Sequence, residues 1–219
     1  MTVLVVSTGL ASPNREKCMA SVAGQRGVEF EHIYIEASER PERLKVQNWY
    51  ESISAHRGGR PIATDVVCLL DGDDHLPHFD VLARVQREHD AGAWVTYGSY
   101  EQADGRSGCC ASVDDDDVRT THWRLSHLKT FRMGLFQRID VGHLKRDGRW
   151  LAHATDLAVM FPVWEQCPPE RRRFISDITY VYDLAASFEW SATPYDLQHE
   201  AEDVAYVRGL PRYERVAAL

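Results

Sequence analysis

Apolar runs separated by polar stretches divide the first half of the chain into alternating strands and helices. Short runs rich in β-branched residues predict strands over Val3–Ser7, Phe30–Glu36, Val66–Leu70 and Ala93–Tyr100. Apolar residues at helical spacing predict helices over Lys17–Gln25, Glu42–His56 and Pro77–His89. The first of these helices is expected to face inward through Met19 and Val22. Such alternation of strands and helices is typical of an α/β protein with a parallel sheet.

The second half of the chain has a less regular pattern. Residues 103–118 contain glycines, two cysteines and the run Asp114–Asp117, which we interpret as a mobile loop with solvated aspartates. Leu128, Phe131, Leu135 and Ile139 form an apolar stripe, which predicts a helix over Thr121–Ile139. An apolar helix near Asp156, a strand over Phe174–Leu184 and a partly helical, aromatic tail follow. With no internal repeat or linker, one domain is expected.

Composition and charge narrow the classes of protein. The 219 residues suffice for one sizeable core, and 44% hydrophobic with 26% charged residues is ordinary for a soluble globular protein. A net charge of −8 disfavours sequence-independent binding of nucleic acid. Five cysteines without CxxC spacing disfavour a zinc site or a disulfide framework. Because no signal peptide or transmembrane segment is evident, we expect a cytoplasmic protein.

An acidic cluster follows the most apolar of the predicted strands. Val66–Leu70 leads into Asp71, Gly72, Asp73 and Asp74, so three carboxylates lie at the end of a buried strand. Their mutual repulsion raises the free energy of the fold unless a cation or water offsets it. Mg²⁺ and Mn²⁺ commonly bind one or two carboxylates together with substrate phosphates. The pattern favours a metal–diphosphate site, and a polar turn at the strand end is the alternative.

Other polar residues are candidates on weaker grounds. Glu36 ends the second predicted strand, where a charged residue is often only solvated. Asp156 lies near a helix N-terminus, as either a cap or a positioned base, and its spacing favours the cap. Trp123, His127 and Arg132 lie on the predicted helix over Thr121–Ile139 and could face a cleft.

Several separated segments, taken together, resemble family 2 glycosyltransferases of the GT-A fold. The similarity covers roughly residues 1 to 190. It lies in the first strand and its loop, the strand ending at Glu36, Gln47-Asn48, Leu70-Asp71-Gly72-Asp73-Asp74, Ser126–Arg132 and Thr155-Asp156. The resemblance implies a Rossmann-like, mixed, mostly parallel sheet flanked by helices. It also implies a single domain over residues 1–219, with a nucleotide-sugar-binding half up to about residue 100 and an acceptor-binding half beyond it.

The resemblance further implies the inverting transfer of a sugar from a nucleotide sugar, most often a UDP-sugar, to a hydroxyl acceptor with Mn²⁺ or Mg²⁺. Asp71 and Asp73 match the DxD motif, and Asp73, Asp71 and Asp74 are the expected metal ligands. The expected nucleotide-sugar-binding residues are Thr8, Glu36, Lys45, Asn48, Asp71, Gly72 and Asp73. Asp156 takes the place of the catalytic carboxylate and would act as general base.

The sequence departs from the family pattern at three places. Glu36 stands where an aspartate is usual, Thr155-Asp156 replaces the common Glu-Asp pair, and no downstream histidine aligns as a metal ligand, with His199 only a distant possibility. A non-catalytic nucleotide- or sugar-binding module of the same fold therefore stays open.

Two other enzyme classes fit less well. A nucleotidyltransferase would need a glycine-rich basic loop after the first strand, which Ser7–Ala11 does not provide. A DxD phosphatase would need a following threonine-type residue, where Asp74-His75 stands. The acceptor could be a glycan, a lipid-linked sugar, a protein side chain or a hydroxylated base in phage-type DNA, with Trp123, His127 and Arg132 as candidate acceptor-side residues.

Overall fold

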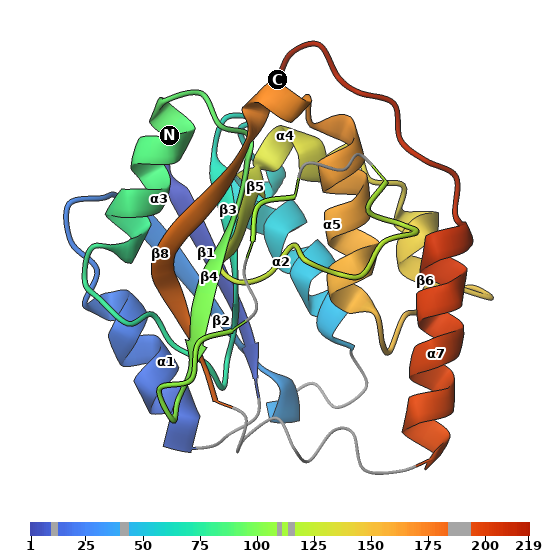
Figure 1. Ribbon diagram of the computed structural model, residues 1–219, viewed down its shortest axis with the longest axis horizontal. Coiled ribbons are helices and arrows are strands. Elements are labelled where there is room, and N and C mark those ends of the chain that lie inside the picture. Colours follow the sequence, from blue (N-terminus) through green and yellow to red (C-terminus); the bar gives the residue numbers. More distant parts are fainter. Residues whose placement is uncertain (10–12, 40–43, 109–110, 114–116, 184–193) are drawn as a thin grey trace.

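A computed structural model describes residues 1–9, 13–39, 44–108, 111–113, 117–183 and 194–219 (Figure 1). Its centre is a six-stranded sheet in the order β2-β1-β3-β5-β4-β8. The strands are β1 (Val3–Gly9), β2 (Phe30–Glu36), β3 (Val66–Asp71), β4 (Val95–Gln102), β5 (Lys129–Arg132) and β8 (Arg172–Tyr182). Only β5 pairs antiparallel with its neighbours, β3 and β4. The sheet is therefore mixed and mostly parallel, as the sequence predicts.

Helices cover both faces of this sheet. They are α1 (Pro13–Ala23), α2 (Lys45–Gly59), α3 (Val81–Asp90), α4 (Met133–Phe136), α5 (Thr155–Gln166) and α7 (Pro194–Gly209). Short 3-10 turns η1 (Ala37–Glu39), η2 (Val141–Leu144) and η3 (Pro169–Arg171) and the hairpin of β6 (Lys145–Arg146) with β7 (Arg149–Trp150) complete the described elements. In Figure 1, α1 and α3 lie on one side of the sheet, whereas α2, α4 and α5 lie on the other and α7 packs outside α5.

The apolar runs of the strands fill two cores, one on each side of the sheet. On β1, Val3 and Val5 face the core beneath α1 and α3, whereas Leu4 and Val6 face the core beneath α2 and α5. Successive side chains of a strand point to opposite faces, so a strand covered on both sides is apolar throughout. This explains the unbroken apolar runs and confirms the predicted single α/β domain.

The helix predicted over Thr121–Ile139 is wrong. Residues 129–132 form the central strand β5, and only the four residues of α4 are helical. Leu128 belongs to one core and Phe131 to the other. Apolar residues three positions apart lie on one face of a helix, but they also suit opposite faces of a strand that is buried on both sides.

The inward face of α1 also differs from the prediction. Cys18 and Val22 are fully buried there, whereas Met19 is 39% exposed. Of the aspartate run at 114–117, residues 114–116 lie outside the described residues, and Asp117 is paired with Arg212 at 2.5 Å. In the ranges that the structure describes, no helix has the length and apolar character to cross a membrane.

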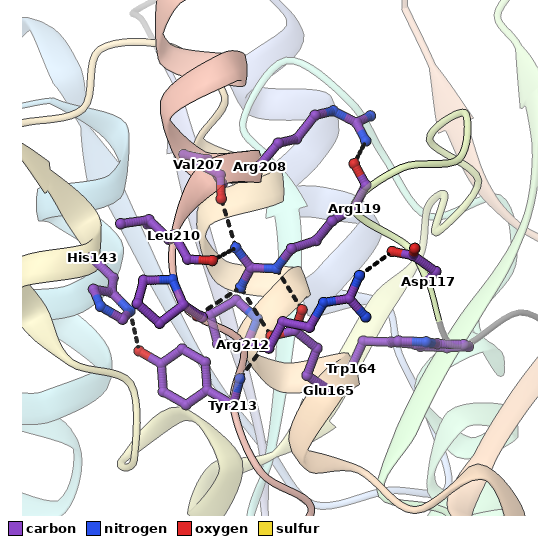
Figure 2. A network of polar contacts seen from close by, with 12 residues as sticks. Asp117, Arg119, His143, Trp164, Glu165, Val207, Arg208, Leu210, Arg212 and Tyr213 are labelled. Carbon is purple, nitrogen blue, oxygen red and sulfur yellow. Dashed lines mark hydrogen bonds and ion pairs between the residues drawn. The ribbon is translucent and has the colours of Figure 1, made fainter.

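A buried ion pair fastens the C-terminal segment to the rest of the molecule (Figure 2). Arg119 Nε lies 2.5 Å from Glu165 Oε1 of α5, and both side chains are at most 5% exposed. The same guanidinium donates hydrogen bonds to the carbonyl oxygens of Val207 and Leu210 at 2.7 and 2.9 Å. The Tyr213 amide donates to Glu165 Oε2 at 3.0 Å. One arginine thus joins α5, the end of α7 and the chain that follows it.

Candidate active site

The predicted donor-side residues meet at the carboxyl ends of the first three parallel strands. In the sheet register Gly9 of β1 lies beside Glu36 of β2, and Thr8 lies beside Asp71 of β3. Adjacent parallel strands end at the same edge of a sheet, and in α/β proteins ligands bind at that edge. The topology therefore brings Glu36, Thr8 and Asp71 into one row.

Two glycines let the loop after β3 cross closely over β1. The Gly72 amide donates to the carbonyl oxygen of Thr8 at 3.0 Å. A Cβ on Gly72 would lie 2.8 Å from both Cα and N of Gly9, a separation that real Cβ atoms essentially never show. Gly72 is thus required by backbone proximity, and it sets the direction in which the chain carries Asp73 and Asp74.

Asp71 is paired with a lysine from the first turn of α2. Lys45 Nζ lies 2.6 Å from Asp71 Oδ1. Burial raises the pKa of Asp71, but the positive charges of Lys45 and then Lys129 together outweigh this effect, so the pKa lies below its usual value. The Asp71 carboxylate is therefore ionised near neutral pH.

Asp74 is held inside the protein by two hydrogen bonds. Tyr180 Oη donates to Asp74 Oδ2 at 2.5 Å, and the Asp183 amide donates to Oδ1 at 2.7 Å. Burial, followed by the charges of Asp71 and Asp73, raises the pKa of Asp74 to about 8. Because both of its oxygens are engaged in this fully buried position, Asp74 supports the loop rather than facing a ligand, contrary to the expectation that it binds the metal.

The carboxylates suit a divalent cation that takes part of its coordination from a substrate. No group of three or more His, Cys, Asp or Glu side chains is arranged to hold a metal within the described ranges. Asp73 is half-buried, and burial and the Asp71 charge raise its pKa. A cation beside Asp73 and Asp71 would relieve this repulsion, and Mg²⁺ is commonly bound by one or two carboxylates plus phosphates and water. The residues present fit such a metal.

Asp156 forms an ion pair that the sequence did not predict. Lys129 Nζ of β5 donates to Asp156 Oδ2 at 2.8 Å, and the lysine side chain is 2% exposed. Burial raises the pKa of Asp156, but the charges of Lys129 and then Lys45 together outweigh this effect, so the pKa lies well below its usual value. Asp156 lies in the first turn of α5, whose N-cap residue, Ala154, makes no side-chain capping bond. The interpretation of Asp156 as a helix cap is wrong.

The three acceptor-side candidates have different positions. His127 stacks on Tyr180 with ring centroids 4.2 Å apart, and burial and the Lys129 charge lower its pKa to about 3. His127 therefore lies near the carboxylates as a neutral ring. Trp123 packs edge-on against Phe161 of α5, at 5.8 Å, and so contributes to the core.

Arg132 is not at this site. In the β5 register Lys129 lies beside Leu69, near the carboxyl end of β3, whereas Arg132 lies beside Val66 at its other end. Its guanidinium donates to the carbonyl oxygen of His89 at 2.6 Å. The expectation that Arg132 faces the acceptor is wrong, because a four-residue strand carries its two ends to opposite edges of the sheet.

Unpaired polar atoms lie among the predicted donor-side residues. Among the described residues, the Thr8 hydroxyl and both amide atoms of Asn48 are buried without a hydrogen-bond partner. Asn48 is 1% exposed, one turn along α2 from Lys45. Glu36 at the end of β2 lies 3.3 Å from Arg15 of α1. Buried polar groups usually have a hydrogen-bond partner. The unpaired hydrogen-bonding groups of Thr8 and Asn48 therefore suit a polar ligand.

Sequence reasoning missed Lys129 and Tyr180. The predicted helix over Thr121–Ile139 includes Lys129, and the sequence gives no signal that separates this helix from the strand β5. Tyr180 lies in the alternating pattern of β8, and only its position beside Asp74 distinguishes it from an ordinary core aromatic.

The sequence matches no family model and no curated protein, but solved structures share its fold. S. aureus TarS 1-349 superposes with a TM-score of 0.61 at 14% identity, over 94% of this chain and 71% of that one. A longer TarS structure gives 0.58 at 15% identity, over 97% of this chain and 44% of that one. TarS 1-349 in complex with UDP-GlcNAc gives 0.53 at 15% identity, over 94% and 72%. The fold is therefore the GT-A fold that the sequence resembles, and the chain spans less than half of the longer TarS chain.

Proposed function

We propose that this chain is a metal-dependent, inverting glycosyltransferase that moves a sugar from a nucleotide sugar, most simply a UDP-sugar, to a hydroxyl acceptor. The observation that carries the proposal is the convergence of Asp71, Asp73 and Asp156 at one edge of a GT-A sheet. A structure with the same fold is a complex with UDP-GlcNAc, which supports a nucleotide sugar as the donor.

On the donor side, the row of residues along β1–β3 supplies the binding groups. We assign Asp73 and Asp71 to the metal, and Thr8, Glu36, Lys45, Asn48 and Gly72 to the nucleotide sugar. A bound Mg²⁺ or Mn²⁺ would act as a Lewis acid for the charge that develops on the diphosphate. Lys45, 2.6 Å from Asp71, can contribute a second positive charge beside the same phosphates.

On the acceptor side, Asp156 is assigned as the general base. An alcohol is a poor nucleophile, so a carboxylate must take its proton as the new glycosidic bond forms, which contributes roughly 10²–10⁴-fold. For inversion, base and leaving group must act from opposite faces of the sugar. Asp156 at the start of α5 and Asp71 at the end of β3 come from different elements and can flank the sugar in this way.

Donor binding is tested by thermal shift and calorimetry with UDP, GDP, CMP and dTDP, each with and without Mn²⁺. We expect one nucleotide to stabilise the protein only with the metal, since a ligand of the folded state stabilises it in proportion to occupancy. Asp73→Ala should abolish this shift, whereas Asp80→Ala, an exposed aspartate beside α3, should not. If no nucleotide binds with any metal, the proposal fails.

Turnover separates an enzyme from a binding module of the same fold. With the nucleotide sugar that binds, we expect release of the nucleoside diphosphate by transfer or slow hydrolysis. Glycans, lipid-linked sugars, peptides and hydroxymethylated DNA are the acceptors to compare. Asp156→Asn should retain donor binding and lose about 10²-fold or more of the activity. Full activity in this variant would refute the assigned base, and donor binding without turnover would favour the binding module.

A further inference from the structure

We infer that Lys129 is the positioning residue for Asp156 in this reaction: its ammonium holds one carboxylate oxygen and leaves the other for the acceptor hydroxyl. The inference rests on the proposed function. It concerns a residue that acts through Asp156 and that has no contact with the substrate.

The position of Lys129 is unusual for a lysine. It begins β5, between β3 and β4 in the centre of the sheet, and only 1% of the residue is exposed. Lysine is almost never fully buried unless it is paired, because desolvation of an ammonium is costly. Its ion pair is with Asp156 at 2.8 Å. A leucine or valine here would extend the apolar core, so the lysine indicates a requirement at the site.

The two oxygens of Asp156 are in different situations. Oδ2 accepts the bond from Lys129, whereas Oδ1 is buried and has no partner in the described part of the chain. Unsatisfied carboxylate oxygens inside a protein are rare, and each calls for an explanation. Because Lys129 restrains one oxygen, rotation of the carboxylate is limited and Oδ1 keeps a defined direction. This is the arrangement that a general base needs.

The charges around Asp156 keep it ionised and ready to accept a proton. The positive charges of Lys129 on β5 and Lys45 on α2 act on Asp156, and the neutral ring of His127 lies beside them. The negative charge of Asp71 on β3 repels that of Asp156. The lysines reduce the basicity of the carboxylate. In return they favour a single protonation state and a fixed orientation when the acceptor arrives.

A double-mutant cycle tests this role. Lys129→Met keeps an unbranched side chain one heavy atom shorter than lysine and removes the charge. We expect kcat to fall about 10²-fold while KM for the donor changes by less than about threefold, because only the orientation of the base is lost. In an Asp156→Asn background the same substitution should change the residual kcat by less than about threefold, since both substitutions disable the same general base. Lys145→Met, whose ammonium stacks on Trp150, is the matched control with full activity.

Two results would overturn the inference. One is a full multiplicative loss from Lys129→Met in the Asp156→Asn background, which would indicate a structural contribution unrelated to the base. The other is a rise in donor KM with unchanged kcat, which would place Lys129 in donor binding. Absence of turnover in the unmodified protein would instead refute the proposed function itself.

A measurement on the unmodified protein covers the case in which Lys129→Met does not fold. The carboxyl carbons of ¹³C-labelled aspartates are followed by NMR from pH 7 to pH 4, with Asp156 assigned from the spectrum of Asp156→Asn. A carboxylate held by the Lys129 ammonium should show no protonation in this range. Titration of Asp156 near the ordinary aspartate pKa of 3.8 would show that the ion pair does not form in solution and would overturn the inference.

Discussion

At the scale of single residues, two lysines balance two carboxylates at the candidate site. Lys45 pairs with Asp71 at 2.6 Å and Lys129 pairs with Asp156 at 2.8 Å. Each pair joins elements distant in the sequence, so the charges meet only in the folded chain. Paired in this way, both carboxylates remain ionised without a metal, and two cations are already in place for the diphosphate of the proposed donor.

Tyr180 is predicted to hold in place the acidic loop after β3, which carries Asp73 and Asp74. In Tyr180→Phe, Asp74 loses the hydroxyl that donates at 2.5 Å and, of its side-chain partners among the described residues, keeps the Asp183 amide. We expect the free energy of unfolding to fall by about 1–3 kcal/mol and metal-dependent nucleotide binding to weaken, measured by urea unfolding and calorimetry. Tyr206→Phe loses a comparable bond to the Lys145 carbonyl, at 2.7 Å, and should leave nucleotide affinity unchanged. Equal affinity in both variants would contradict the role of Tyr180.

At the scale of elements, β5 connects the end of β3, with Asp71, to the start of α5, with Asp156. It is antiparallel in an otherwise parallel sheet, so its first residue lies at the edge where β3 ends. Lys129 therefore meets Asp156 near the acidic loop, while Arg132 at the other end ties β5 to α3 through the His89 carbonyl. The direction of one short strand decides which of its charged residues can take part in chemistry.

His89 of α3 is predicted to make the fold sensitive to acid. Its ring nitrogens lie 2.8 Å from Thr130 Oγ1 and 3.0 Å from the Ala93 carbonyl oxygen. Burial, and then the charge of Arg132, lowers the pKa of His89 from 6.5 to about 3. The unfolded chain therefore binds a proton below pH 6.5 that the folded protein does not take up until about pH 3. The stabilising contribution of the buried, neutral His89 is fully present above pH 6.5 and is lost as the pH falls below this value.

For this group alone, the free energy of unfolding should be about 2 kcal/mol lower at pH 5 than at pH 7. Urea unfolding at the two pH values measures the difference. His89→Gln should be less stable at pH 7, but its stability should fall less between pH 7 and pH 5 than that of the unmodified protein. His122→Gln, on the protein surface, should keep the full pH dependence. A dependence unchanged by His89→Gln would refute the prediction.

At the scale of the whole molecule, the Arg119–Glu165 pair ties the C-terminal segment to the core (Figure 2). Arg119 donates to carbonyl oxygens at the end of α7, and Arg208 donates back to the carbonyl oxygens of Arg119 and Thr121. These bonds hold α7 beside α5, the helix that begins with Thr155 and Asp156. Residues 207–213 thus stabilise α5, which carries the proposed base Asp156, from outside the site.

Arg119→Met should destabilise the fold and loosen its C-terminal segment. The substitution leaves Glu165 buried without its cation, which typically costs about 3–5 kcal/mol. Urea unfolding gives the loss of stability, and hydrogen exchange should show faster exchange at the amides of residues 207–216. Arg106→Met breaks an exposed pair with Asp104 and should change stability by less than about 1 kcal/mol. Similar effects of the two substitutions would argue against the buried pair as the anchor.

Much of the fold, and the meeting of Thr8, Glu36 and Asp71 at one edge of the sheet, was predictable from the sequence. Unbroken apolar runs fit strands covered on both faces, so Val3–Ser7 and Val66–Leu70 indicated a parallel sheet with helices on both sides. The ends of parallel strands share an edge, and so the order of residues along the chain is enough to place Thr8, Glu36 and Asp71 together. Local pattern sufficed because these residues are positioned by the strands that carry them.

Tertiary structure alone decided the rest. Leu128 and Phe131 fit a helix as well as a two-sided strand, and only the pairing of β5 with β3 and β4 distinguishes the two. That pairing gives Asp156 its lysine and removes Arg132 from the site, and the packing of β8 turns Asp74 toward Tyr180. Hydrophobic periodicity records whether a position is buried. It carries no information on strand direction or on which distant charges meet, because both arise from contacts between segments far apart in the chain.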